Sequence, residues 1–178
     1  MEPGNTTPIS TRICAECTER LLDRDRLILS KDGSMFTRIL YPTDGSDVAE
    51  YALDWAIDLA ESTGSEIFVL HVVEDGKRLD HSGLDILRNI GREFVQKACR
   101  KIEEHGIVAH PTIVDGKPYH EIINFAKSEK IMMIVMGTHG VGGLSRALLG
   151  SVADRVIRTS SCPVLLVPAM AAKVKDDH

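Results

Sequence analysis

From residue 36 onward the chain alternates between two kinds of segment, and this alternation constrains the fold more than any other feature. Five short runs are apolar and rich in β-branched residues, as is typical of strands buried on both faces of a sheet. Four longer segments carry apolar residues at helical spacing. Because strands that alternate with helices form βαβ units with right-handed crossovers, the sequence predicts an α/β fold with a five-stranded parallel sheet. The expected strands are 36–42, 66–73, 108–115, 131–137 and 162–168, and the expected helices are 46–63, 84–106, 118–130 and 150–160.

The ends of the expected helices carry residues that favour helix boundaries. Ser46 or Asp47 is expected to cap the first helix, and Gly64 is expected to end it. Gly106 is expected to end the second helix, and Pro118 occupies a first-turn position that tolerates proline. The first helix is expected to bury one apolar stripe, formed by Val48, Ala52, Trp55, Ala56, Leu59 and Ala60.

The two ends of the chain do not join this pattern. Residues 1–34 are either a mobile N-terminal arm or the result of a wrongly assigned start, since Met35 directly precedes the first strand. Cys14 and Cys17 form a CxxC pair, but a structural zinc site needs four ligands and no second pair is near, so we interpret the pair as incidental. We expect one domain over residues 35–170 and a solvated tail over residues 171–178.

Charge and composition exclude several classes of protein. The formal net charge of −5 argues against a nucleic-acid-binding protein with a broad basic face. No apolar run is long enough for a membrane span, and the first residues lack the pattern of a secretory signal. The four cysteines are too few and too unevenly spaced for a disulfide framework. We therefore expect a protein of the reducing cytoplasm, with neither nucleic acid nor membrane as a partner.

The stretch VMGTHGVGGLSRALLGSVADRV, residues 135–156, holds five of the fourteen glycines. The fourth expected strand ends at about Met136. Gly137 and Gly140 would allow the chain to turn there with backbone torsions that a β-carbon forbids. A loop then leads to a helix that starts at Gly150 and Ser151, whose first amides have no partner within the helix. Such a strand, loop and helix start forms a seat for a phosphate or another anion. Alternatively, the glycines only serve a crossover loop and Ser151 is a helix cap.

At these residues the chain resembles the universal stress protein family. The family's ATP-binding signature is matched by the spacing of three glycines. Gly137 and Gly140 are separated by two residues, and the pair Gly150-Ser151 follows after nine more residues. The resemblance extends from Met35 to about Pro168 and includes the segments ILYPTDGSDVAEYALDWA, VLHVVED and SCPVLLVP. It implies a three-layer sandwich with strand order 3-2-1-4-5, a Rossmann-like fold that binds adenine nucleotides. That order places a topological switch between the first and fourth strands, where open α/β sheets bind ligands.

The resemblance also assigns roles to individual residues of the proposed pocket. Asp44, at the first strand exit, would contact the nucleotide or hold a Mg²⁺ ion on its phosphates, or else would only supply charge at the helix start. The backbone of Val72 would read the edge of adenine, while His71 is expected to be a structural histidine. His139 and Arg146 lie in the glycine-rich loop, either solvated or touching phosphate. The remaining residues that match the nucleotide pocket are Pro42, Thr43, Met136, Gly137, Gly140, Gly150, Ser151 and Val152.

The resemblance implies an ATP-binding regulatory or stress-response protein with slow or no intrinsic hydrolysis. One alternative is an ATP hydrolase or another adenine-nucleotide enzyme. The related ATP-pyrophosphatases need SGGxDS at the first strand exit, where this chain has PTDGSD, and no catalytic pair that could activate a water is evident. A second alternative is a module that binds AMP, cyclic AMP or ADP.

The expected last strand predicts self-association. The segment Pro163–Pro168 is apolar and β-branched, and in the family order it lies at an edge of the sheet. An exposed edge of this kind pairs readily with another chain, and two flanking prolines limit such pairing to a short segment. We therefore expect a homodimer through the fifth strand, as the family resemblance also implies, and a protein partner of unknown identity.

Overall fold

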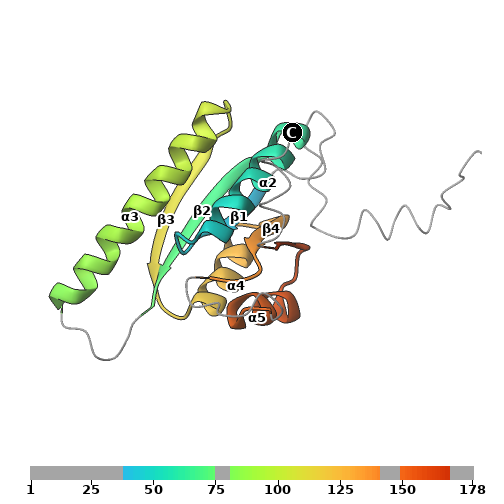
Figure 1. The fold of residues 1–178 in the computed structure, drawn as a ribbon. Helices are drawn as coiled ribbons and strands as arrows, with labels where there is room; N and C mark the ends of the chain where they lie inside the picture. The colour runs from blue at the N-terminus through green and yellow to red at the C-terminus, as the bar shows by residue number, and fades with distance from the viewer. Residues whose placement is uncertain (1–37, 75–80, 141–148, 169–178) are drawn as a thin grey trace, which may run out of the picture.

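A parallel sheet with strand order β3-β2-β1-β4-β5 forms the centre of the molecule (Figure 1). The structure is a computed structural model that describes residues 38–74, 81–140 and 149–168. The expectations about residues 1–34, the Cys14–Cys17 pair, Arg146 and the C-terminal tail fall outside these residues. The elements are β1 (Arg38–Pro42), α2 (Asp47–Thr63), β2 (Glu66–Val73), α3 (His81–Glu104), β3 (Ala109–Asp115), α4 (Pro118–Ser128), β4 (Met133–Gly137), α5 (Ser151–Thr159) and β5 (Val164–Val167).

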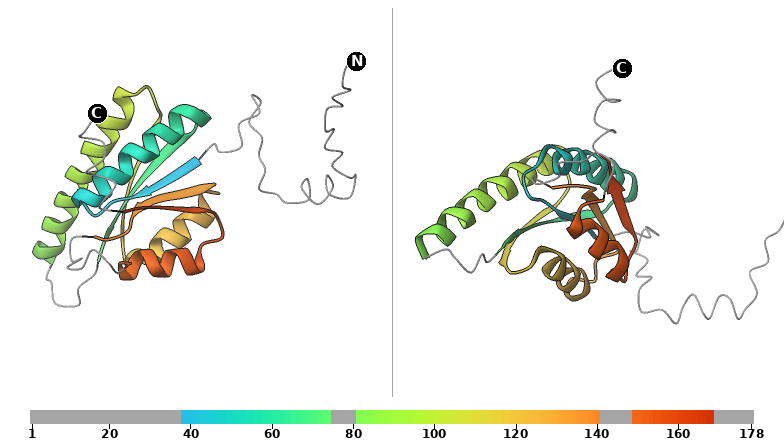
Figure 2. Two further views of the ribbon diagram at one scale, coloured as in Figure 1. Left: turned by 45° about the vertical axis from the view of Figure 1, so that its right-hand side comes forward. Right: turned by 60° about the horizontal axis from the view of Figure 1, so that its bottom comes forward.

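The helices form two layers, one on each face of the sheet (Figure 2). α2 and α3 cover one face, and α4 and α5 cover the other. The strand order reverses at β1, because the chain first builds outward to β3 and then returns to place β4 on the other side of β1. Since crossovers are right-handed, this reversal places the later helices on the opposite face. The predicted α/β fold and the strand order 3-2-1-4-5 are confirmed.

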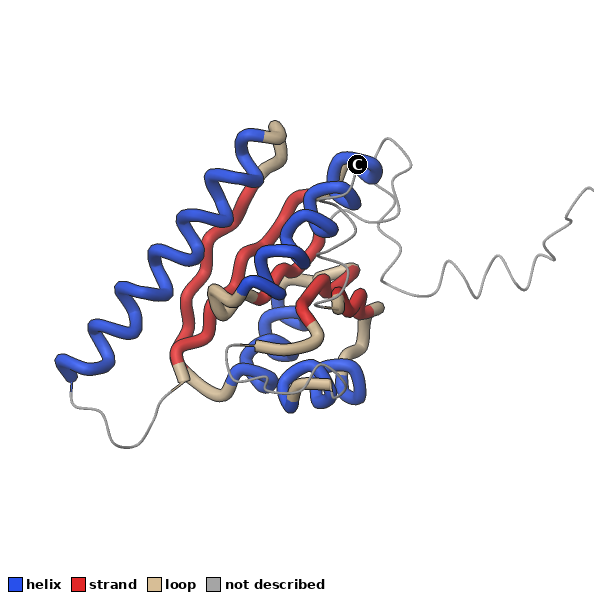
Figure 3. The backbone as a smooth tube through the Cα atoms, in the orientation of Figure 1, coloured by secondary structure: helices blue, strands red, loops and turns tan. Residues whose placement is uncertain are grey.

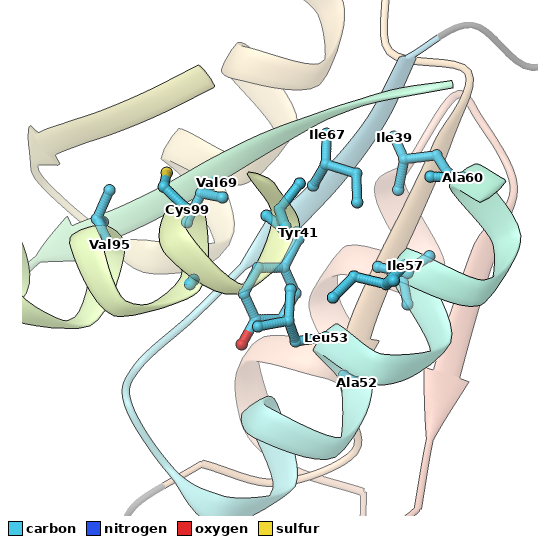
Figure 4. Packing of buried hydrophobic residues seen from close by; sticks show 14 of the residues in the cluster. Ile39, Tyr41, Ala52, Leu53, Ile57, Ala60, Ile67, Val69, Val95 and Cys99 are labelled. Atoms are coloured by element: carbon cyan, nitrogen blue, oxygen red, sulfur yellow. The ribbon is translucent and has the colours of Figure 1, made fainter. Parts of the chain in front are cut away.

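Alternating side chains of the central strands build two separate apolar cores. Ile39 and Tyr41 of β1 point toward α2 and α3, where they join a cluster that includes Leu53 and Val95 (Figure 4). Leu40, between them, belongs to the cluster under α4 and α5. This period of two on both faces is the reason why the central strands consist of nearly unbroken apolar runs.

Tyr41 is the largest side chain that is fully buried. Its hydroxyl donates a hydrogen bond of 2.8 Å to the backbone oxygen of Ala49, in the first turn of α2. Burial raises the pKa of the phenol well above its usual value near 10, so the hydroxyl stays protonated and remains a donor. The hydrogen bond to Ala49 ties the middle of the sheet to the start of the helix that follows β1.

The expected helix boundaries are confirmed at most positions. Ser46 is the N-cap of α2 and accepts a hydrogen bond from the amide of Ala49, while Gly64 ends the helix in the left-handed conformation, with φ 68°. Pro118 is the first residue of α4. α3 ends near Gly106 as expected, but it begins at His81, before the first apolar residue of its repeating pattern.

The expected apolar stripe of α2 is wrong at Trp55, whose side chain is 45% exposed. The buried face includes Leu53 and Ile57 instead. The reason is that α2 packs on the sheet and also beside α3, where Lys97 and Lys101 pair with acidic residues of α2. This second neighbour turns the buried face of α2 toward α3 and leaves Trp55 on the opposite flank.

The expectation that every strand is buried on both faces is also wrong at the two sheet edges. β3 has no fully buried residue, and β5 has one, Val167. An edge strand has a neighbour on one side only, and the helices of each layer centre on the inner strands, so side chains at the edges stay partly exposed. Within the described ranges, no helix combines the length and the apolar character that a membrane crossing requires.

We predict that Tyr41→Phe lowers the free energy of unfolding by about 1 kcal/mol, because the variant loses a buried hydrogen bond and keeps the packing of the ring. Urea denaturation followed by circular dichroism measures this change. Tyr51→Phe, on the partly exposed part of α2, is the matched control and should leave stability within experimental error. Equal stability of the Tyr41→Phe variant and the unmodified protein would contradict the structural role of this hydroxyl.

Candidate functional site

A cavity of about 490 Å³ opens at the carboxyl edge of the sheet, where the chain leaves β1 and β4. The helices that follow these two neighbouring strands, α2 and α5, lie on opposite faces of the sheet (Figure 3). The cavity lies at this topological switch and also touches the end of β2 and the start of α4. The predicted site residues that line it are Pro42, Thr43, Asp44, Val72, Met136, Gly137, His139, Gly140, Gly150, Ser151 and Val152.

The turn after β1 forms the first wall of the cavity, and short hydrogen bonds fix it. The amide of Thr43 donates to Leu70 O at 2.9 Å, which extends the pairing of β1 with β2 by one residue. Oδ1 of Asp44 accepts from the amide of Ser46 at 3.1 Å and from its hydroxyl at 2.6 Å. The carboxylate of Asp44 therefore has a defined direction at the cavity wall.

The exit of β4 forms the second wall. The amide of Thr138 donates to Val167 O at 3.0 Å, which continues the pairing of β4 with β5. Thr138 O in turn accepts from the amide of Gly150 at 2.8 Å. This bond holds the N-terminus of α5 directly against the strand exit, so both ends of the glycine-rich loop meet at the cavity.

Close contact explains three of the glycines in this stretch. Gly137, Gly140 and Gly150 do not have the left-handed torsions that the sequence predicted for the first two. A β-carbon at Gly140 would overlap Oδ2 of Asp44, and one at Gly150 would lie 3.0 Å from Thr138 O. Gly140 and Gly150 thus lie where the two strand exits and the helix start approach one another closely, whereas a β-carbon at Gly137 would lie 2.9 Å from Cγ1 of Val48 in α2.

The described lining of the cavity carries uneven charge. Asp44 and Glu74 contribute carboxylates, and neither lysine nor arginine is present in this part of the lining. The N-terminus of α5, at Gly150 and Ser151, supplies the favourable end of a helix dipole. An anionic ligand would therefore rest on this helix start and gain from a cation shared with Asp44. No cluster of three or more metal-binding side chains occurs among the described residues.

His139 lines the cavity between the exit of β4 and the start of α5. Its Nδ1 is 2.9 Å from the hydroxyl of Thr138. Its Nε2 is buried and has no hydrogen-bond partner in the described part of the chain. The structure places His139 in the lining of the cavity, and its contact with phosphate, the second of the two possibilities that the sequence left open, stays a prediction.

The opposite end of the cavity is apolar. Leu70, Val72 and Met136 line it from the strands, and Pro118 and Ile122 line it from α4. The lining residues that the sequence did not predict are Ala49, Leu70, Glu74, Pro118, Ile122, Thr138 and Ala153. Glu74 could have been found, because it directly follows the strand that ends at Val73 and the exits of parallel strands share one edge. The contribution of α4 depends on which face that helix covers, and local pattern does not decide this.

Known proteins resemble this chain in sequence and in fold. A model of the universal stress protein family matches residues 35–168. Universal stress protein MJ0531 of Methanocaldococcus jannaschii is 38% identical over 147 residues, which cover 79% of this chain and 86% of the relative. The solved structure of MJ0577 from the same organism has a TM-score of 0.66 and 34% identity, and the match covers 75% of this chain and 96% of that one. The structure of the universal stress protein from Archaeoglobus fulgidus in complex with dAMP has a TM-score of 0.59 and 25% identity, with coverage of 75% and 98%.

We predict that Gly140→Ala destabilises the protein by about 1–3 kcal/mol, because the added methyl group overlaps the carboxylate of Asp44. In an Asp44→Ala background the same substitution should cost much less, since the overlapping atoms are absent. Thermal denaturation of the four proteins in this double-mutant cycle measures the coupling. An equal cost of Gly140→Ala in both backgrounds would show that the glycine is required for another reason.

Proposed function

The chain belongs to the universal stress protein family, and on this basis we propose that it binds ATP and acts as a nucleotide-dependent regulatory protein in the response to stress. The observation that carries the proposal is the cavity at the switch between β1 and β4. One end of it is apolar and the other lies at a helix N-terminus, which matches the two ends of a nucleotide.

An adenine nucleotide is the ligand that the comparisons favour. The Archaeoglobus fulgidus relative was solved in complex with dAMP, which has the base and phosphate of an adenylate. The volume of about 490 Å³ is within the usual range for pockets that hold a small molecule of this size. Mg²⁺ bound with the nucleotide would neutralise its phosphates beside Asp44, since the described lining supplies no lysine or arginine. AMP, cyclic AMP and ADP remain the alternative ligands of the same site.

We propose slow or no intrinsic hydrolysis, with an ATP hydrolase as the alternative function. A hydrolase requires a base within hydrogen-bond reach of the attacking water. The carboxylate of Asp44 lies against Gly140, and its Oδ1 already accepts two hydrogen bonds from Ser46. This arrangement favours a positioning role for Asp44. Release of phosphate from ATP by the purified protein, measured with and without Mg²⁺, decides between the two functions.

We predict that Ser151→Asp lowers the affinity for ATP at least tenfold, because it places a negative charge where the phosphates are expected to lie. The same charge at the start of α5 favours the helix, so stability should not fall. Isothermal titration calorimetry with ATP measures the affinity. Ser82→Asp is the matched control, because it adds one charge near the start of α3, away from the cavity, and should leave ATP binding unchanged.

The bound nucleotide itself gives a second test of this function. Protein purified without added ligand is denatured, and the released small molecules are separated and identified by mass spectrometry. Recovery of an adenine nucleotide would identify the natural ligand. If the unmodified protein neither carries nor binds any adenine nucleotide at millimolar concentration, the proposed function is wrong.

We further propose that the protein is a homodimer through β5. Trp55 of α2 and Ile157 of α5 are 45% and 47% exposed. Trp55 lies on the flank of α2 that faces away from α3. Arg155 stacks on Tyr119 of α4, with its guanidinium carbon 4.6 Å from the ring centre, so Ile157 lies on the other flank of α5. Both exposed side chains therefore border the free edge of β5, and a two-fold contact would bury them together with that edge.

We predict that the double variant Trp55→Lys, Ile157→Lys is monomeric in sedimentation experiments at tens of micromolar, while the unmodified protein is dimeric at that concentration. Both side chains are substantially exposed, so the two substitutions should not destabilise the folded monomer. Any fall in the melting temperature should come only from the loss of the dimer interface. Charged residues at Val167 would not give a clean test, because that side chain is buried. A monomeric unmodified protein would refute the dimer.

A further inference from the structure

His71 of β2 lies outside the lining of the cavity, on the face of the sheet that α3 covers. Its Nδ1 is 2.9 Å from the backbone oxygen of Thr43, which does line the cavity. A carbonyl oxygen only accepts hydrogen bonds, so Nδ1 carries the hydrogen and donates it. The side chain of one layer thus holds a backbone group at the edge of the proposed nucleotide site.

This contact interrupts the regular pairing of β1 with β2. The amide of Thr43 donates to Leu70 O at 2.9 Å, and in a continuous parallel ladder Thr43 O would next accept from the amide of Val72. Thr43 O instead accepts a hydrogen bond from Nδ1 of His71. Among the described residues, the bond from Thr43 to Leu70 is the last backbone hydrogen bond between these two segments at this end.

The direction of the Val72 backbone follows from the same ladder. The amide of Gly116, just after β3, donates to Val73 O at 3.0 Å, so Val73 presents its polar groups to the β3 side. Successive residues of a strand alternate between its two neighbours, and Leu70 presents its oxygen to β1. The N–H and C=O of Val72 therefore face the β1 side, at a level where the chain has already turned away into the cavity wall.

α3 leaves a fitted space for the imidazole. A β-carbon at Gly91 would overlap the ring of His71 and lie 2.9 Å from its Nε2. The ring of Phe94 meets the imidazole edge-on, with centroids 5.7 Å apart, and the same phenyl ring fills the position that a side chain at Gly45 would take. Gly91 and Phe94 thus determine where His71 and the turn after β1 lie.

We propose that His71 is a positioning residue for recognition of the adenine base. By holding Thr43 O on the α3 side of the sheet, it keeps that acceptor from the amide of Val72. The N–H and C=O of Val72 then stand open to the cavity as one donor and one acceptor on the same side. Adenine presents the complementary pair, N1 as acceptor and the N6 amino group as donor. This inference rests on the proposed function and assigns its specificity for the base to a residue outside the cavity.

Two substitutions of His71 separate positioning from packing. In His71→Asn the amide nitrogen stands at the place of Nδ1 and still donates to Thr43 O, whereas His71→Leu has similar bulk and no donor. We expect His71→Leu to weaken ATP binding about tenfold, the effect of losing one good hydrogen bond, and His71→Asn to restore most of the affinity. Inorganic tripolyphosphate, which lacks the base, should bind equally to all three proteins.

Val69→Ala is the matched control for a loss of stability. Val69 lies two residues before His71 on the same face of β2 and is fully buried, so its truncation weakens the core without touching Thr43. It should lower the melting temperature and leave ATP affinity unchanged. If ATP affinity falls equally in Val69→Ala and His71→Leu, or is the same in His71→Leu and the unmodified protein, the positioning role is refuted.

A measurement without nucleotide keeps this test independent of the proposed function. In the unmodified protein the amide of Val72 should exchange rapidly with deuterium, and an imidazole proton should be seen on Nδ1 of His71 by nitrogen-15 NMR. In His71→Leu the amide of Val72 gains Thr43 O as a partner, and its exchange should slow. If the protein binds no adenine nucleotide but shows these signatures, the proposed function fails while the positioning of Thr43 stands. An unchanged exchange rate of Val72 overturns the inference even where ATP binds.

Discussion

The close approach of the two strand exits, where Gly140 meets the carboxylate of Asp44, is the contact on which the rest of the structure depends. β1 and β4 are neighbours in the sheet, yet their chains continue to opposite faces. A parallel sheet with right-handed crossovers must open at such a reversal, and the opening is the cavity. Ser46 directs Asp44 across this opening, and glycine on the facing side lets the exits come together.

Two helices of the same layer, α5 and α4, would serve the two ends of the proposed ligand differently. The phosphate end would rest on backbone groups, because the bond from Gly150 to Thr138 brings the start of α5 to the exit of β4. The base end would rest on apolar side chains, which include Ile122 of α4. The described lining contains neither lysine nor arginine, so the proposed nucleotide would depend on a helix dipole and on a bound cation.

The layer formed by α2 and α3 takes part in this site without entering the cavity. His71 holds the carbonyl of Thr43, and Gly91 and Phe94 of α3 shape the space that the imidazole occupies. A small shift of α3 would therefore reach the edge of the cavity through one hydrogen bond. The opposite flank of α2 carries Trp55 toward β5, so one helix layer connects the proposed nucleotide site with the proposed dimer contact.

Local patterns in the sequence predicted the alternation of strands and helices and most helix ends, because side-chain periodicity and capping act over a few neighbouring positions. The residues of the strand exits were assigned mainly through the family resemblance. The resemblance supplied the strand order, which the structure confirms. Tertiary structure decided which flank of each element meets a neighbour. It placed Trp55 outside the core, made Gly140 necessary through contact with Asp44 and not through its torsions, and turned His71 toward Thr43. Periodicity defines the faces of an element, but the partner that each face meets depends on how distant segments pack together.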